Sequence, residues 1–244
     1  GRGEMKDGKM TLTDAIVTQV QRELDQDGNG TINAEEFEEW YVQQPERKVK
    51  RGHGSVVKEI TQFPDPENRN VLSCSYDGSV KVWCMKTGDI LQTLEDTHGK
   101  KTQVFEVCGF PDNAQIMTCG GDATVKVWDW KSGKCNATLK GHAEKKNPVR
   151  GCGVFTCGKK AFSCSKKGEI KIWQLTLDAD GTTVTGGSVL LSLDGHTDLV
   201  DRCCLYNDDT RLISASWDNT LRVWDVKTGE EIFKLKDHNK ARGI

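Results

Sequence analysis

The chain repeats itself over most of its length, and this repetition limits the folds that it can adopt. Four segments end alike, as DGSVKVW at 77–83, DATVKVW at 122–128, KGEIKIW at 167–173 and DNTLRVW at 218–224. Their closing tryptophans are 45, 45 and 51 residues apart. A period near 40–45 residues with such an ending predicts a repeat in which each unit supplies four β-strands.

All five histidines lie in register with these tryptophans; they are His53, His98, His142, His196 and His238. The pattern resembles the WD-repeat family, whose blades begin near Gly-His and end near Trp-Asp. The resemblance implies a mainly β fold, a partial β-propeller of four-stranded blades, with four repeats and the start of a fifth. The resemblance implies seven as the commonest number of blades, and closure into a ring is how propellers remove open sheet edges, so we expect either a longer protein or a second chain that completes the ring.

The resemblance also implies a hydrogen-bonded network within each blade, made by a histidine, a strand serine or threonine, a turn aspartate and the tryptophan. The matching residues are His53, Ser73, Asp77 and Trp83, then His98, Thr118, Asp122 and Trp128, and in the fourth repeat His196, Ser214, Asp218 and Trp224. The third repeat keeps His142, Ser163 and Trp173 but has Lys167 in place of the aspartate, so we expect its network to be broken.

These networks bear on enzymatic activity, because a histidine near a serine and an aspartate resembles a catalytic triad. A set that recurs blade after blade is better interpreted as a structural device that satisfies buried polar groups. The sequence contains no nucleophile elbow, P-loop, HExxH or dinucleotide-binding fingerprint. We therefore expect no catalytic residues and no enzymatic activity.

A second motif, DQDGNGTINAEE at 25–36, precedes the repeats and resembles the calcium loop of the EF-hand family. Ca²⁺ takes six to eight oxygens, which such a loop supplies from positions 1, 3, 5, 7, 9 and 12, with glycine at position 6. The corresponding ligands are Asp25, Asp27, Asn29, Thr31 through its carbonyl, Asn33 and Glu36. The motif predicts a Ca²⁺ site, and the alternative is a relic loop that no longer binds.

The segments beside the loop predict amphipathic helices, with apolar residues such as Val20 before it and Trp40 after it. Further upstream we expect a helix start capped by Thr11 or Thr13. Residues 1–45 carry a net charge of −6, which sets this part apart from the rest. The predicted domains are an EF-hand helix-loop-helix at 1–44, a basic linker at 45–52 and the propeller at 53–244.

Ten cysteines suggest a disulfide framework until they are placed in the repeats. Cys74, Cys119 and Cys164 share one repeat position, and we assign Cys108, Cys152 and Cys204 to another. A cysteine that recurs at one position is best interpreted as a small buried apolar residue. We therefore expect reduced thiols and an intracellular, cytoplasmic protein, with a cytoskeletal or ciliary location as a variant.

The predicted partners are other proteins, docked on the propeller face that holds the inter-blade loops and the aspartate turns. Basic residues gather there, namely Lys100, Lys101, Lys145, Lys146, Arg150, Lys166 and Lys167. They form either a solvated surface or a dock for an acidic partner, which includes the EF-hand of the same chain. The linker PERKVKR is too short for nucleic acid, and no apolar run approaches the ~18 residues of a membrane span.

Three functions remain open. The first is a calcium-sensing scaffold that presents partners. The second is a static structural scaffold, ciliary or microtubule-associated, and the third is the non-catalytic part of a larger enzyme. One insertion, DADGTTVTGG at 178–187, resembles the start of another calcium loop but lacks a chelating residue at its end. We interpret it as a hairpin with an Asp-Gly turn.

Overall fold

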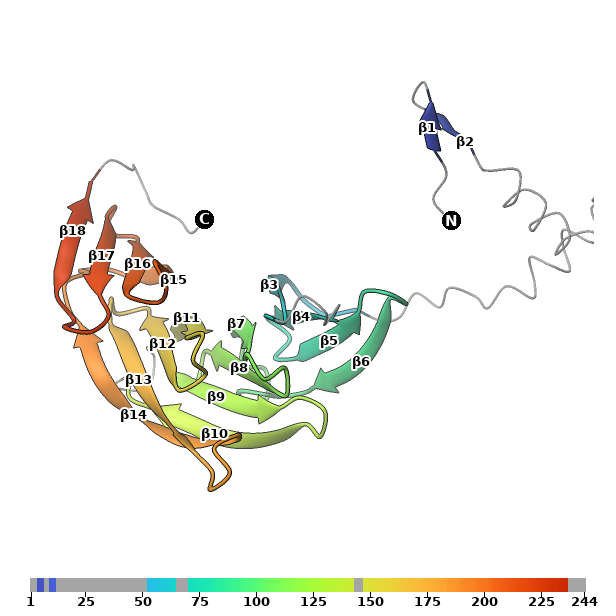
Figure 1. Cartoon of the computed structure of the whole chain (residues 1–244), viewed down its shortest axis with the longest axis horizontal. Coiled ribbons are helices and arrows are strands. Elements are labelled where there is room, and N and C mark those ends of the chain that lie inside the picture. Colours follow the sequence, from blue (N-terminus) through green and yellow to red (C-terminus); the bar gives the residue numbers. More distant parts are fainter. Residues whose placement is uncertain (1–3, 7–8, 12–51, 65–69, 143–146, 237–244) are drawn as a thin grey trace, which may run out of the picture. The chain divides into compact units, whose positions relative to one another are not determined.

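The computed structural model (Figure 1) describes residues 4–6, 9–11, 52–64, 70–142 and 147–236. The chain divides into two units, Gly1–Lys50 and Arg51–Ile244. Within the described residues there is no helix, and therefore none long and apolar enough to cross a membrane.

In the first unit, β1 (Glu4–Lys6) pairs antiparallel with β2 (Lys9–Thr11). Thr11 lies opposite Glu4 in this hairpin, and the helix that it is predicted to cap lies outside the described residues, so that assignment stays a prediction. The predicted calcium loop at 25–36, both of its flanking helices and Thr13 lie outside the described residues.

In the second unit, the described residues form four antiparallel sheets of four strands each, which we call blades one to four. Blade one contains β3 (Val57–Gln62), β4 (Asn70–Ser75), β5 (Val80–Cys84) and β6 (Asp89–Leu94). Blade two contains β7 (Val104–Gly109), β8 (Gln115–Gly120), β9 (Thr124–Asp129) and β10 (Lys134–Lys140).

Blades three and four repeat this order. Blade three contains β11 (Val149–Val154), β12 (Lys160–Ser165), β13 (Ile170–Leu177) and β14 (Val184–Leu193). Blade four contains β15 (Val200–Tyr206), β16 (Arg211–Ser216), β17 (Leu221–Asp225) and β18 (Glu231–Leu235). The prediction of a mainly β chain built from four-stranded blades is confirmed for this unit.

Each blade turns between its second and third strands through a residue in the left-handed region. These residues are Gly78, Ala123, Gly168 and Asn219, with φ of +89°, +66°, +83° and +65°. Glycine and asparagine adopt this conformation at little cost, whereas alanine is strained there. The next blade closes over the turn, because a Cβ on Gly168 would lie 2.7 Å from the His196 carbonyl oxygen.

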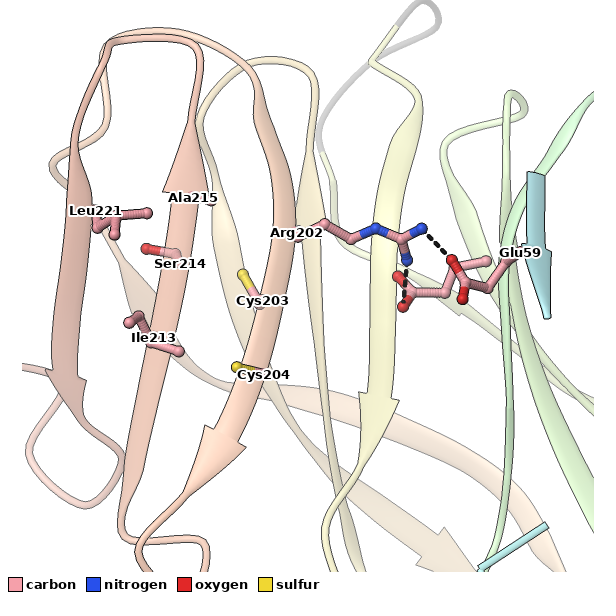
Figure 2. Close-up of a pocket in the computed structure, with 9 residues that line it drawn as sticks. Glu59, Arg202, Cys203, Cys204, Ile213, Ser214, Ala215 and Leu221 are labelled. Carbon is pink, nitrogen blue, oxygen red and sulfur yellow. Dashed lines mark hydrogen bonds and ion pairs between the residues drawn. The ribbon is translucent and has the colours of Figure 1, made fainter. Parts of the chain in front are cut away.

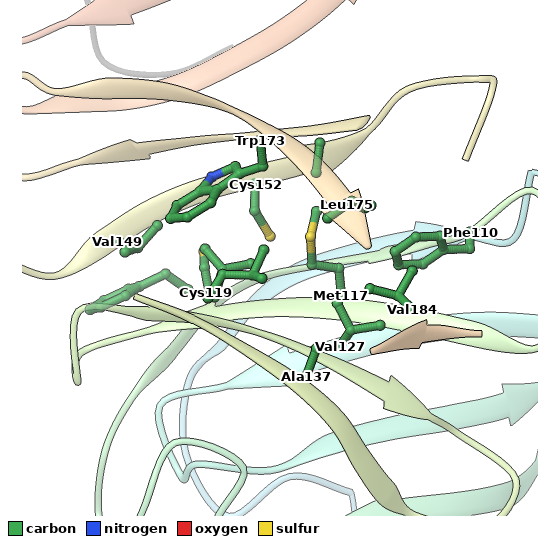
Figure 3. Close-up of a cluster of buried hydrophobic side chains, with 14 residues drawn as sticks. Phe110, Met117, Cys119, Val127, Ala137, Val149, Cys152, Trp173, Leu175 and Val184 are labelled. Carbon is green, nitrogen blue, oxygen red and sulfur yellow. The ribbon is translucent and has the colours of Figure 1, made fainter. Parts of the chain in front are cut away.

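Successive blades pack through apolar cores, and their first strands, β3, β7, β11 and β15, lie next to one another. The core between blades two and three, shown in Figure 3, brings Met117 and Cys119 against Cys152 and Trp173. Similar clusters of described residues join blade one to blade two and blade three to blade four. Each blade is therefore held mainly by its neighbours in the chain.

The insertion at 178–187 forms the predicted hairpin, since the Asp178 amide donates to the Thr183 carbonyl and Gly181 has a φ of +71°. Its base reaches blade two. Gln115 donates to the Thr182 carbonyl over 2.9 Å and accepts from the Val184 amide over 2.8 Å. The insertion that lengthens the third repeat therefore extends blade three, and the base of its hairpin contacts blade two.

All ten cysteines lie in the described part of the chain, and all are free thiols. Cys74, Cys119 and Cys164 occupy equivalent positions and are buried. The second assignment is wrong, because Cys152 pairs with Ser163 and so matches Cys203. A shift of one residue along a strand moves the side chain to the opposite face. Cys204 is exposed, whereas Cys152 is buried.

Candidate functional site: the blade networks and the turn face

The predicted histidines connect each blade's entry loop to its second strand. His53 Nε2 lies 2.6 Å from Ser73 Oγ, and Trp83 Nε1 donates to the same oxygen over 2.8 Å. The matching distances are 2.9 and 3.0 Å at Thr118 in blade two, and 2.7 and 2.9 Å at Ser214 in blade four. The structure therefore brings histidine, hydroxyl and indole together in each of these blades.

The aspartates complete the networks from the turn. His98 Nδ1 lies 2.7 Å from Asp122 and His196 Nδ1 lies 2.7 Å from Asp218. In blade one the distance from His53 Nδ1 to Asp77 is 3.4 Å, and Ser79 Oγ lies closer at 2.9 Å. A neutral histidine fits this arrangement, because Nδ1–H donates toward the turn while Nε2 accepts the hydroxyl proton.

The electrostatics agree with neutral histidines. Burial lowers the pKa of all four histidines, which are His53, His98, His142 and His196, and the pKa of His142 falls to about 4. Burial alone would raise the pKa of Asp77, but hydrogen bonds from Ser79 and Gly54 lower it to about 2. A triad serine needs an open side for a substrate, whereas Ser73 and Ser214 are buried between a histidine and a tryptophan.

The third network is complete, contrary to the prediction from Lys167. Glu169 supplies the carboxylate, which lies 3.2 Å from His142 Nδ1 and accepts from Asn147 Nδ2 over 2.9 Å. His142 Nε2 and Trp173 Nε1 meet Ser163 Oγ at 2.6 and 2.8 Å. The acidic group has moved two residues along the turn, to the place where the other blades carry serine or threonine.

The aspartate turns and entry loops share one face of the blades, which we call the turn face. Each turn begins at a residue whose amide bonds to the entry loop of its own blade; these residues are Tyr76, Gly121, Lys166 and Trp217. Trp217 is 44% exposed and Lys166 is exposed on the preceding blade. The exposed indole gives this face an aromatic side chain of the kind that protein interfaces favour, and Lys166 adds positive charge to the same face.

The predicted basic residues fall in separate parts of the structure. Lys100 and Lys101 are exposed in the loop between β6 and β7, and Lys166 and Lys167 are exposed in the turn before β13. Lys145 and Lys146 lie outside the described residues. Arg150 belongs between blades, because it pairs with Asp201 over 3.1 Å and lies 4.3 Å from the Phe105 ring centroid.

The first strands carry a charge cluster that sequence reasoning missed. Arg202 of β15 pairs with Glu106 of β7 over 2.8 Å and also with Glu59 of β3 (Figure 2). Burial raises the pKa of Glu106 to about 7 against the opposing effect of Arg202. The three residues occupy equivalent positions in their blades, since each lies one residue from the bulge in its first strand.

Within the described residues, no group of three or more His, Cys, Asp or Glu side chains is placed to hold a metal ion. The six predicted Ca²⁺ ligands belong to the segment that the structure leaves undescribed.

Comparison with protein families identifies four repeats. The family model of the WD domain, G-beta repeat, matches residues 44–84, 88–129, 133–174 and 177–225. Each of the last three matches holds the final strand of one blade and the first three strands of the next.

Known proteins are similar over shorter stretches. The small ribosomal subunit protein RACK1 of Saccharomyces cerevisiae is 50% identical over 44 residues, which is 18% of this chain and 14% of the relative. Subunit I of the eukaryotic translation initiation factor 3 of Schizosaccharomyces pombe is 40% identical over 48 residues, 20% of this chain and 15% of the relative. These alignments cover about one repeat each. The four family matches span most of the chain and agree with its four blades, so this chain belongs to the WD domain, G-beta repeat family.

Proposed function

We propose that this chain is a protein-interaction scaffold, in which the blades present the turn face to partner proteins and the loop at 25–36 binds Ca²⁺. The observation that carries the first part is Trp217, a large aromatic side chain that is 44% exposed on the turn face. Aromatic residues of this kind commonly anchor protein partners. The histidine, serine and aspartate groups of the blades are used in structural hydrogen bonds, which favours binding over catalysis.

The similar proteins support a scaffold by analogy. Two of them are named as a ribosomal subunit protein and as a subunit of an initiation factor, so both belong to assemblies of several chains. The analogy rests on short alignments and carries no specific partner to this chain. A static structural scaffold, or the non-catalytic part of a larger enzyme, is the alternative function.

The exposed lysines support an acidic partner for the turn face. Lys166 and Lys167 are both exposed and extend from the blade next to Trp217. Clustered positive charge attracts acidic surfaces over about a Debye length. The acidic segment at 1–45 is a candidate partner within the same chain, and bound Ca²⁺ would then reduce its negative charge and weaken the contact.

The Ca²⁺ part rests on the chemistry of the donor set. Three carboxylates, two amides and one carbonyl offer six ligands at the spacing of a twelve-residue loop, and seven oxygens when Glu36 chelates with both of its own. Calorimetry with millimolar Mg²⁺ present should give a dissociation constant of roughly 10⁻⁷–10⁻⁵ M, lost in Glu36→Gln. No difference between the two proteins would remove Ca²⁺ from the proposal and leave the scaffold.

The scaffold part is tested by comparing matched variants in affinity purification with quantitative mass spectrometry. Trp217→Ala and Lys166→Glu change the turn face, whereas Lys227→Glu changes an exposed charge in the turn between β17 and β18. Partners that are retained by Lys227→Glu and lost by both turn-face variants support docking there. Equal recovery by all three variants would refute it. Binding of an acidic peptide to the chain, compared with binding of the same peptide in which glutamine replaces the acidic residues, then tests whether the turn face recognises negative charge.

A further inference from the structure

A pocket of about 240 Å³ lies between blades two and three, on the face opposite the turn face. It is formed by the loop between β7 and β8, the loop between β11 and β12, and the hairpin between β13 and β14. Phe110, Pro111 and Leu177 give it an apolar lining. Small-molecule sites commonly measure roughly 300–1,000 Å³, so the size of this pocket favours a single side chain of a partner.

The walls of the pocket are held in place by Gln115, which is 4% exposed. Its side-chain nitrogen donates to Asp112 Oδ2 over 2.8 Å and to the Thr182 carbonyl over 2.9 Å, while its side-chain oxygen accepts from the Val184 amide over 2.8 Å. These bonds tie the hairpin of blade three to the loop of blade two. The pocket therefore exists before a ligand enters, and binding requires little ordering of the chain.

Asp112 is the one charged residue among the described residues that line this pocket. Its Oδ1 accepts from the amides of Ala114 and Gln115 over 2.9 and 3.1 Å, and within the described part of the chain Oδ2 accepts from Gln115 Nε2. An ionised carboxylate has about four acceptor positions. Asp112 is exposed, so its remaining position is accessible to a donor on a ligand.

The equivalent pocket between blades three and four has a different balance of charge. Asp208 is the counterpart of Asp112 there, because each lies three residues before the second strand of its blade. This pocket measures about 480 Å³. Its described lining contains three carboxylates and three cations, which are Asp208, Asp209, Asp225, Lys160, Arg211 and Lys227. Arg211 already pairs with Asp225 over 2.6 Å, so a further cation gains less here than beside Asp112.

We propose that the pocket between blades two and three binds a lysine or arginine side chain of a partner protein. The apolar lining contacts the methylene groups of that side chain, and its charged end donates to Asp112 Oδ2. Long basic side chains commonly bury their stems in this way while the charged end stays in polar surroundings. This site is separate from the turn face, so Trp217→Ala should leave its affinity unchanged.

The test is a nuclear magnetic resonance titration of the full chain, labelled with ¹⁵N-glycine. The probes are the capped tripeptide acetyl-Ala-Arg-Ala-amide and its counterpart with citrulline in place of arginine. Gly158 and Gly181 line the pocket, so their amide signals should shift saturably with the arginine peptide. Citrulline has nearly the shape of arginine without its charge, so the citrulline peptide should bind at least about fivefold more weakly.

Three variants locate the binding. Asp112→Asn should weaken binding of the arginine peptide by the same factor, because the side-chain oxygen can keep both backbone bonds while the charge is lost. Asp208→Asn is the matched control in blade four and should bind like wild type. Thr182→Lys adds a basic side chain to the lining and should block the peptide. Protection of the Val184 amide from hydrogen exchange shows whether the hairpin stays attached in each variant.

Saturable shifts at both glycines that require the arginine charge and Asp112 would support the proposal. The absence of a saturable shift, equal affinity for the citrulline peptide, or unchanged binding by Asp112→Asn would overturn it. Where Asp112→Asn loses the protection of Val184, Thr182→Lys decides the outcome. Wild-type affinity in Thr182→Lys would show that the peptide binds elsewhere and would also overturn the proposal.

Discussion

Glu169 offers a direct test of how the third blade is held together. Its carboxylate accepts from His142 Nδ1 at 3.2 Å and from Asn147 Nδ2 at 2.9 Å. Both partners are nearly inaccessible, at 5% and 0% exposure. Glu169→Thr leaves Asn147 without this acceptor and His142 with a weak one, because the threonines of blades two and four lie 3.4 Å from their histidines.

A buried donor left unsatisfied costs about 1–3 kcal/mol, so Glu169→Thr should lower the free energy of unfolding by about 2–4 kcal/mol. The triple variant Asn147→Thr, Lys167→Asp and Glu169→Thr recreates the residues of blade two, and should return to within about 1 kcal/mol of wild type.

Urea unfolding followed by tryptophan fluorescence measures these values, and hydrogen exchange of β12 and β13 locates the loss. Lys167→Asp alone is the control and should not stabilise, since Glu169 already occupies the network. A Glu169→Thr variant within about 0.5 kcal/mol of wild type would refute the assignment of Glu169. A triple variant no more stable than Glu169→Thr would show that the position of the acid is not interchangeable.

Three further predictions concern protons, charge and thiols. Burial lowers the pKa of His142 to about 4, so between about pH 6.5 and pH 4 the unfolded chain binds a proton at this histidine that the folded chain does not. The free energy of unfolding should therefore be constant above pH about 6.5 and fall toward pH 4. A urea midpoint that does not change over this range would contradict the prediction. Arg202→Met should lower the free energy of unfolding by about 3–5 kcal/mol at pH 8, because it leaves the Glu106 carboxylate buried without its partner. The loss should be smaller at pH 5.5, where Glu106, with a pKa raised to about 7, is neutral, and an equal loss at both pH values would argue against the charge cluster. Native protein should react with a thiol reagent at exposed Cys135 and not at buried Cys74 until it unfolds, and equal rates would contradict the burial.

Much of the fold could be predicted because repetition makes separate signals agree. A tryptophan every 45–51 residues, with a histidine before each blade, indicated both the number of blades and their boundaries. The insertion at 178–187 was also predicted, since an Asp-Gly turn between strands has a local cause. The calcium loop remains a prediction, because its residues lie outside those that the structure describes.

The errors have physical causes that a sequence pattern does not carry. Matching by position located the missing aspartate at Lys167 but not its substitute, although Glu169 stands where serine or threonine follows the other aspartates. Cys152 was placed one residue out of register, which is enough to exchange a buried face for an exposed one. Arg202 and Glu59 are 143 residues apart, so only the assembled first strands bring them together.

The family repeat and the blade are out of step by one strand, and this offset has a consequence for how such chains change in length. The match at 88–129 includes β6, which closes blade one, and β7, β8 and β9, which open blade two. Losing one such unit would join β5 directly to β10, and the shortened chain would still have a fourth strand to complete the sheet. Gain of a unit works in the same way. Tandem duplication and unequal crossing-over can therefore add or remove whole blades without leaving an unpaired edge, which makes blade number an evolvable property.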